Sequence, residues 1–271
     1  MPPSPSAAAE ARGAAPATPQ PTSPTAAPGA HPEPAEEAPP ASPPPTLPAG
    51  ITVGSVVRLP VPGDAPVLVV HAPAPVRRAA VYLHGVCGDI EAIGAFAEVA
   101  AEHFTLVALH ADEPCSGAPG RHRWTSDTAR QERRIAAALE AVRAAREGHL
   151  DTAPRLGIGY SQGALRALAL HVRAPELYPR LLLGGLPAAP DAARLDGLQA
   201  LALVTGEREG HEVVNSALKQ VTARGIAAER FVLPRAGHGQ YGPEAPRVMG
   251  EAIRWVLSSE PDGAEGAPDG S

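Results

Sequence analysis

The pattern of apolar and polar positions changes at Ile51, after which short apolar runs alternate with amphipathic stretches rich in Ala, Leu, Arg and Glu. Apolar runs of this length are typical of buried strands, and amphipathic stretches are typical of helices. In the longest amphipathic stretch, residues 127–146, Ile135, Leu139 and Val142 lie at helical spacing along one face. The predicted strands are 53–61, 67–72, 79–83, 105–109, 155–159, 181–185, 199–204 and 229–233. The predicted helices are 90–102, 127–146, 161–172, 212–224 and 243–257.

Strands and helices mostly alternate from the third predicted strand onward. Such alternation is typical of a parallel sheet that is covered by helices on both faces. Only residues 62–66, Pro-Gly-Asp-Ala-Pro, separate the first two strands, which favours an antiparallel hairpin leading into the sheet. We therefore predict an α/β fold of three layers with a mostly parallel, eight-stranded sheet.

The composition of residues 1–49 differs from that of the rest of the chain. Of the 33 prolines, 16 lie within the first 50 residues, which contain no Phe, Trp, Tyr or Val. Such a stretch cannot bury enough apolar surface to offset the entropy lost on ordering. We predict a disordered Pro/Ala-rich tether over 1–49, one folded domain over 50–260 and a disordered tail over 261–271. A featureless tail and a spacer from a membrane or cell wall both fit the tether.

Charge and aromatic content exclude several classes of partner. The formal net charge is −6, only 3% of the residues are aromatic, and Lys219 is the only lysine. Nucleic-acid binding needs clustered cations interleaved with stacking rings, so we expect no nucleic-acid partner. No apolar run is long enough to span a bilayer. Residues 2–30 also lack the charged start and apolar centre of a secretion signal.

Residues 159–163, Gly-Tyr-Ser-Gln-Gly, follow an apolar strand and open a helix. A serine at a tight strand-to-helix turn takes a strained backbone conformation, and side chains two residues away on either side would collide. Its hydroxyl then stands above the sheet at a helix N-terminus, where backbone amides can receive an anion. We predict that Ser161 is a nucleophile. The alternative is a serine that only caps the helix.

A nucleophilic serine needs a base that is oriented by a third group. His238 lies between two glycines in a loop after the last predicted strand, and these glycines let the loop bring the imidazole over the sheet edge. Histidine suits the role because its pKa lies near neutrality, so we predict His238 as the base. The histidines that we expect to be structural or exposed are His31, His71, His103, His149 and His171.

The orienting carboxylate is expected after the predicted strand 199–204. Glu209 is our first choice and Glu207 the alternative, while Glu212 and Asp191 remain open. Glutamate can take the place of aspartate here, although its extra methylene makes its placement harder to predict. A carboxylate that does not orient the histidine would instead interact with the partial positive charge at a helix N-terminus.

Residues 84–88, His-Gly-Val-Cys-Gly, follow the predicted strand 79–83. A loop of this kind can present a backbone amide to a developing oxyanion. We predict the amides of Val86 and Gln162 as the two donors. His84 itself is expected to be structural rather than a proton carrier.

These residues together resemble the α/β-hydrolase superfamily over about 200 residues. The Ser-Gln-Gly turn is similar to that of the phospholipase/carboxylesterase and acyl-protein thioesterase group, as is Trp124 followed by Asp127. The family commonly has an aspartate where this chain has Glu209. The resemblance implies hydrolysis of a small-molecule ester or thioester through an acyl-serine intermediate, without a metal or organic cofactor.

Substrate-binding features are harder to read from the sequence. The segment between Leu186 and Gln199 leaves little room for a lid, which favours a small esterase or thioesterase over a lipase. Trp124, Tyr160 and Tyr241 are candidates for the acyl or alcohol pocket, and core packing explains them equally well.

Cys87 and Cys115 both lie in loops at the carboxyl ends of neighbouring predicted strands. Such loops lie close together above an α/β sheet, so a disulfide fits as well as two free thiols. A bridge would brace the predicted oxyanion loop and imply an oxidising compartment. Together with the tether, it favours an exported or surface-tethered protein over a cytoplasmic one.

Two other functions remain open at this point. A serine peptidase of the prolyl-oligopeptidase type would need an extra domain or a recognition element for a peptide amino group, and neither is evident. A binding protein that keeps the fold without turnover would be favoured if none of Glu207, Glu209 and Glu212 could reach His238.

Overall fold

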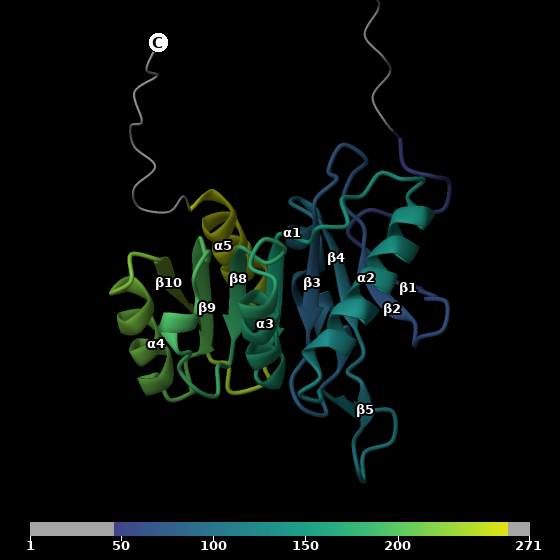
Figure 1. The fold of residues 1–271 in the computed structure, drawn as a ribbon. Coiled ribbons are helices and arrows are strands. Elements are labelled where there is room, and N and C mark those ends of the chain that lie inside the picture. The colour runs from purple at the N-terminus through teal and green to yellow at the C-terminus, as the bar shows by residue number, and fades with distance from the viewer. Residues whose placement is uncertain (1–45, 260–271) are drawn as a thin grey trace, which may run out of the picture. The chain divides into compact units, whose positions relative to one another are not determined.

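An eight-stranded sheet forms the centre of the computed structural model, which describes residues 46–259 (Figure 1). Its pairs are parallel except for β1–β2 and β2–β4, which are antiparallel. This arrangement confirms both the predicted α/β class and the initial hairpin. In sheet order the strands are β1 (Val56–Leu59), β2 (Val67–Val70), β4 (Thr105–Leu109), β3 (Ala79–Leu83), β7 (Leu156–Tyr160), β8 (Arg180–Gly184), β9 (Ala200–Gly206) and β10 (Ala227–Leu233).

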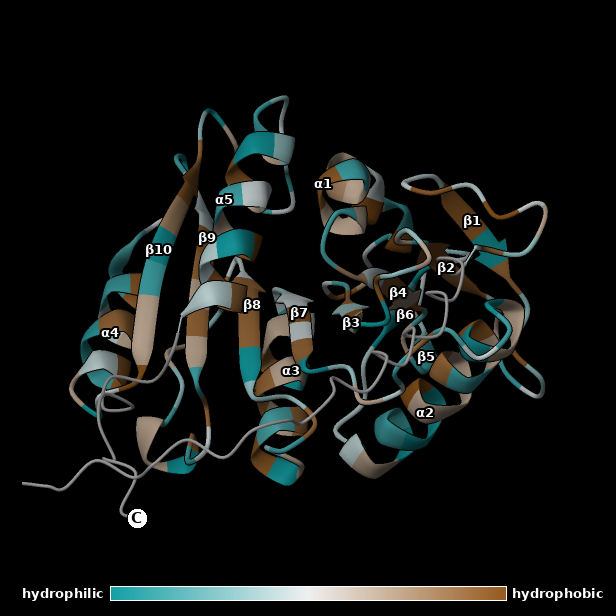
Figure 2. Cartoon of the chain, turned by 90° about the horizontal axis from the view of Figure 1, so that it is seen from above, coloured by the Kyte–Doolittle hydropathy of each residue, from teal (hydrophilic) through white to brown (hydrophobic). Residues whose placement is uncertain are grey.

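Helices cover both faces of the sheet, as Figure 2 shows from above. The short helix η1 (Ile90–Phe96), α1 (Ala97–Ala101) and α5 (Ala245–Ser258) pack in one apolar core. The helices α2 (Thr128–Ala145), α3 (Gln162–Arg173) and α4 (Glu212–Thr222) pack in the other. The predicted three layers are therefore present.

Alternation along β3 explains why both cores form. Val81 and Leu83 belong to the core under α2, α3 and α4, whereas Ala80 and Tyr82 belong to the core under α1 and α5. Successive side chains of a strand point to opposite faces, and a strand that is buried on both faces needs a continuous apolar run. Tyr82 is thereby directed to the α1/α5 face, close to the carboxyl edge of the sheet.

Most predicted elements begin and end within two residues of the observed ones. The prediction of one helix over 90–102 was wrong in detail, because the segment starts as η1, with Asp89 accepting a hydrogen bond from the amide of Glu91, before α1 begins. The hairpin of β5 (Glu113–Pro114) and β6 (His122–Arg123) was not predicted, and neither was the short helix η2 (Ala192–Arg194). Elements of two or three residues are too short to leave a periodic pattern.

The connection between β8 and β9 contains only η2, so within the described residues it carries no lid. None of the helices described is both long and apolar enough to cross a membrane. Residues 1–45 and 260–271 lie outside the described part of the chain. The tether over 1–49 and the tail over 261–271 therefore remain predictions.

Candidate active site

Ser161 is the single residue between the end of β7 and the start of α3. Its backbone has φ 52° and ψ −116°, a conformation that non-glycine residues rarely adopt. Residues with such strained backbone conformations cluster at functional sites. The Ser161 amide donates a hydrogen bond to the carbonyl of Gly184 at 2.8 Å, which ties the turn to β8. The sharp turn lifts the side chain above the carboxyl edge of the sheet, as expected for a nucleophile elbow.

The glycines on either side of this turn are required by close packing. A Cβ atom on Gly159 would lie 2.5 Å from the carbonyl oxygen of Gly163. A Cβ atom on Gly163 would lie 1.9 Å from the carbonyl oxygen of Leu83, in the neighbouring strand β3. The spacing of glycines around Ser161 is therefore a steric consequence of turning from β7 into α3 against β3.

A chain of two hydrogen bonds joins Ser161, His238 and Glu209. His238 Nε2 lies 3.1 Å from Ser161 Oγ, and His238 Nδ1 lies 2.6 Å from Glu209 Oε1. An ionised carboxylate can only accept hydrogen bonds, so Nδ1 carries the imidazole proton. Nε2 is then left with a lone pair that faces the serine hydroxyl.

Backbone hydrogen bonds hold the loops that carry Glu209 and His238 against each other. The amides of Glu207 and Arg208 donate to the carbonyls of Leu233 and Ala236, each at 2.9 Å. These bonds join the loop after β9 to the loop after β10. The two loops are thus placed by main-chain contacts between parallel neighbouring strands.

The second carboxylate oxygen of Glu209 has partners of its own. Glu209 Oε2 accepts hydrogen bonds from the Gly206 amide at 2.5 Å and from Thr205 Oγ1 at 3.3 Å. The Glu209 side chain is only 11% exposed, whereas that of His238 is 55% exposed. A shielded, fully bonded carboxylate therefore supports an imidazole that is open to solvent.

The other candidate carboxylates are occupied elsewhere. Glu207 Oε2 accepts a hydrogen bond from the Arg235 amide at 2.6 Å, so it holds the loop without contacting His238. Asp191 accepts from the Ala193 amide at the start of η2, and Glu212 lies in the first turn of α4. No three His, Cys, Asp or Glu side chains between residues 46 and 259 are grouped as a metal site would require.

The loop after β3 lies directly against the serine. The Gly88 amide donates to the Gly85 carbonyl at 3.0 Å and closes a tight turn. A Cβ atom on Gly85 would lie 3.2 Å from Ser161 Cβ. Gln162 is in the first turn of α3, where an amide has no carbonyl partner within the helix. The amides of Val86 and Gln162 remain our predicted oxyanion donors.

His84 is buried beneath this loop. His84 Nε2 accepts a hydrogen bond from the Ala111 amide at 3.1 Å, so Nδ1 carries the proton and donates to the Gly85 carbonyl at 2.7 Å. Burial lowers the pKa of His84 to about 4. A neutral imidazole with both nitrogens bonded to the backbone positions the loop.

Trp124 does not line the cavity beside Ser161, and its contacts fit the core packing that was the alternative to a place in a substrate pocket. It is 4% exposed, and its indole N–H donates to the His84 carbonyl at 2.8 Å. The side chain of Gln162 accepts from the Trp124 amide at 2.9 Å and donates to the Trp124 carbonyl at 3.0 Å. Trp124 and the Gln162 side chain thus brace the loops around Ser161, a role that the sequence alone did not reveal.

Tyr160 and Tyr241 do line this cavity, which has a volume of about 170 Å³ and also includes Ser161, His238 and Val86. The Tyr160 hydroxyl accepts a hydrogen bond from the Gly239 amide at 2.6 Å, next to His238. Burial raises the pKa of Tyr160 to about 12, so its hydroxyl stays neutral. Tyr160 therefore helps to hold the histidine loop, in addition to forming part of the cavity wall.

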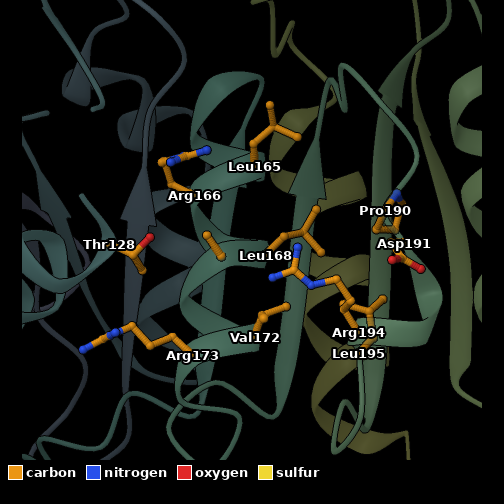
Figure 3. Close-up of a pocket in the computed structure, with 11 residues that line it drawn as sticks. Thr128, Leu165, Arg166, Leu168, Val172, Arg173, Pro190, Asp191, Arg194 and Leu195 are labelled. Atoms are coloured by element: carbon orange, nitrogen blue, oxygen red, sulfur yellow. The ribbon is translucent and has the colours of Figure 1, made fainter. Parts of the chain in front are cut away.

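Two further cavities differ in whether Ser161, His238 or Glu209 lines them. A cavity of about 300 Å³ lies on another side of His238 and includes Arg208, which sequence reasoning missed. A groove of about 710 Å³ lies along α3, where Figure 3 shows Arg194 extending from η2 toward Leu168. Ser161, His238 and Glu209 do not line this groove. We therefore place the candidate site at the two cavities that His238 lines.

Cys87 and Cys115 form a disulfide, as the bridge prediction expected. It joins the turn after β3 to the loop that contains β5 and β6. An ion pair of 3.1 Å between Arg121 and Asp89 and a β-bridge between Gly88 and His122 support the same connection. The hairpin is thus attached covalently to the predicted oxyanion loop.

Removing this bridge is expected to lower both stability and activity. The cysteines are 28 residues apart, for which the chain-entropy relation gives roughly 3–4 kcal/mol. That corresponds to a Tm lower by roughly 6–16 °C. The double variant Cys87→Ser/Cys115→Ser should show this decrease in calorimetry, together with a lower kcat/KM because the Val86 amide is less firmly placed. Dithiothreitol should reproduce the change in the wild type and leave the double variant unaffected. An unchanged Tm in both cases would contradict the prediction.

No family model matches the chain, and no curated protein matches it in sequence. Several solved esterases are similar to it in structure. Naproxen esterase, a carboxylesterase of Bacillus subtilis, has a TM-score of 0.51 at 13% identity, over 75% of this chain and 91% of that one. Esterase PE8 has a TM-score of 0.54 at 20% identity, over 74% and 100% of the two chains. An esterase of M. tuberculosis has a TM-score of 0.50 at 15% identity, over 76% and 92%.

At these identities the similarity concerns the fold. The strand order agrees with it, because β3 lies between β4 and β7 and the remaining parallel strands follow in sequence order. The turn at Ser161, at the carboxyl end of β7, has the backbone geometry and the position expected of a nucleophile elbow in this architecture. The chain therefore has the fold of the α/β-hydrolase superfamily.

Proposed function

We propose that this protein is a serine hydrolase that cleaves carboxylic ester or thioester bonds through an acyl-serine intermediate. The observation that carries the proposal is the hydrogen-bonded chain from Ser161 Oγ through His238 to Glu209, with distances of 3.1 and 2.6 Å. These three groups have the types and connections of a nucleophile, a base and an orienting acid.

The first half of the proposed reaction forms the acyl-enzyme. Ser161 Oγ attacks the acyl carbon while its proton passes to His238 Nε2, and the Glu209 carboxylate stabilises the imidazolium that results. The negative charge on the former carbonyl oxygen is received by the amides of Val86 and Gln162. When the tetrahedral intermediate collapses, the bond to the leaving oxygen or sulfur breaks, and the proton on Nε2 passes to that atom.

The second half repeats these steps with water. His238 Nε2 takes a proton from water while the hydroxyl oxygen attacks the acyl carbon, and the bond to Ser161 Oγ then breaks. The serine recovers its proton from the imidazole, and a carboxylic acid is released. The scheme uses only groups of this chain, the substrate and water.

Two observations favour an ester substrate over a peptide. The described residues form a domain around one eight-stranded sheet, without the extra domain that a peptidase of the prolyl-oligopeptidase type would need. The cavities that His238 lines are about 170 and 300 Å³, which suits small groups on either side of a scissile bond. The condition that would favour a non-catalytic binding protein is not met, because Glu209 reaches His238.

Covalent labelling tests the proposal. A fluorophosphonate probe is expected to label the wild type and to leave Ser161→Ala unlabelled, because the probe reacts with an activated serine. Rates on p-nitrophenyl esters and on prolyl amides then separate esterase from peptidase activity, and we expect activity on the esters. A wild-type protein that resists the probe would favour the binding protein, and faster cleavage of the amides would favour the peptidase.

A further inference from the structure

The aromatic cavity beside Ser161 contains polar groups that the proposed triad does not use. Its wall includes Tyr82 at the end of β3 and Tyr241 in the loop before α5. Ser161 and Val86 line the same cavity. With the acyl carbon on Ser161 Oγ and its oxygen toward the Val86 amide, the rest of the acyl group starts inside this space.

The size of the cavity limits the acyl group. Its volume is about 170 Å³, equal to that of about six molecules of liquid water at ~30 Å³ each. Phe96 fixes its wall from behind, with ring centroids 6.2 Å from Tyr82 and 5.5 Å from Tyr241. Counting about one non-hydrogen atom for each such volume, the space suits a chain of roughly four to six non-hydrogen atoms.

Tyr82 and Tyr241 leave one hydroxyl proton for a ligand. Their hydroxyl oxygens are 3.3 Å apart, so one phenol donates to the other. Each phenol has one proton, and among residues 46–259 no other hydrogen bond involves either hydroxyl. Whichever phenol donates within the pair, the other keeps an O–H that can donate a hydrogen bond to an acceptor in the cavity.

Burial keeps both phenols in the protonated form. It raises the pKa of Tyr82 to about 12 and that of Tyr241 well above its ordinary value. None of the residues that line this cavity is Lys or Arg, so a carboxylate buried in it would have no guanidinium or ammonium partner there. An acceptor without charge is thus favoured over a carboxylate.

We propose that the acyl group of the substrate is short and carries an uncharged oxygen, as in an ether, a hydroxyl or a keto group, that accepts a hydrogen bond from the Tyr82–Tyr241 pair. This inference rests on the proposed hydrolase function. It assigns to the two phenols a role in selecting the substrate, while Ser161 carries the chemistry.

Two esters of equal size test this role. In p-nitrophenyl 3-methoxypropionate an ether oxygen, which can only accept a hydrogen bond, replaces one methylene of p-nitrophenyl pentanoate. Each kcat/KM is divided by the rate of hydrolysis of that ester by hydroxide, which removes differences in intrinsic reactivity. In the wild type, the corrected kcat/KM of the methoxypropionate is expected to be about five- to tenfold higher than that of the pentanoate. This is the effect of one neutral hydrogen bond.

Variants show whether the phenols cause this preference. Tyr82→Phe and Tyr241→Phe are each expected to reduce the corrected ratio toward one, and the double variant to abolish the preference. Tyr178→Phe is the matched control, because Tyr178 is as buried as Tyr82 but belongs to the other core, so it should keep the wild-type ratio. p-Nitrophenyl octanoate, which is too long for the cavity, should be cleaved more slowly than the pentanoate.

The outcomes are separable. A corrected ratio near one in the wild type, or a preference that survives the double variant, would overturn the role of the phenols. Octanoate cleaved as fast as pentanoate would overturn the size limit. The wild-type ratios decide both points even if a phenylalanine variant does not fold. If neither ester is hydrolysed and the fluorophosphonate probe leaves Ser161 unlabelled, the hydrolase proposal itself fails, and this inference with it.

Discussion

Replacing Ser161 with alanine is expected to lower kcat on p-nitrophenyl acetate by about 10⁵- to 10⁶-fold. The variant loses the hydroxyl oxygen that lies 3.1 Å from His238 Nε2, so no acyl-enzyme can form. The oxyanion donors and the cavities remain, and the activity left should be what they alone supply over water. Steady-state rates at high enzyme concentration measure this difference.

The control for this variant is Ser126→Ala. Ser126 is exposed in the loop before α2, and within residues 46–259 it makes one hydrogen bond, which its backbone carbonyl accepts from the Thr128 amide at 2.9 Å. We expect it to keep the wild-type kcat and Tm. If Ser161→Ala kept more than about one hundredth of the wild-type kcat while folding normally, Ser161 would not be the nucleophile.

The residues around Ser161 were predictable because their constraints are local. Gly159, Ser161 and Gly163 lie within five positions, and the steric need for glycine at each end leaves a fixed spacing in the sequence. The strands were predictable for a similar reason. Burial on both faces requires a continuous apolar run, as in β3, and such a run is visible without knowledge of its neighbours.

The substrate cavity was less predictable because it is formed by residues far apart in the sequence. Tyr82 and Tyr241 are 159 residues apart, and only the fold brings their hydroxyls together. The sequence left two places open for Trp124, because an aromatic residue in a loop near a candidate active site can lie in a pocket or in the core. The hydrogen bonds of Trp124 with His84 and with Gln162 hold this residue in the core. No pattern in the sequence indicates these contacts.

The choice between Glu209 and Glu207 also depended on the fold. The two residues differ by two positions in one loop, and both follow the same strand. Backbone bonds between the loops after β9 and β10 turn Glu209 toward His238 and Glu207 toward the amide of Arg235. The sequence ranked the two, but it could not supply the direction in which each side chain points.

Glu209→Gln is expected to lower kcat by about 10⁴-fold without unfolding the protein, an effect of the size found for the equivalent change in serine proteases. The Gly206 amide and Thr205 hydroxyl both donate to Oε2, so the amide oxygen of the glutamine must take that position. Its NH₂ group then faces His238 Nδ1 as a donor. The imidazole must in turn carry its proton on Nε2, where it can no longer accept the proton of Ser161.

Glu207→Gln provides the matched control, because it makes the same chemical change two residues away. Glutamine keeps an oxygen that can accept from the Arg235 amide, so this loop contact survives and kcat should change by no more than a few-fold. Melting curves establish that both variants fold, after which kcat on p-nitrophenyl acetate compares them. If Glu207→Gln had the larger effect, the loop after β9 would have to adopt another conformation in solution, in which Glu207 faces the imidazole. Equal and small effects would mean that His238 acts without a carboxylate partner, which the 2.6 Å contact to Glu209 argues against.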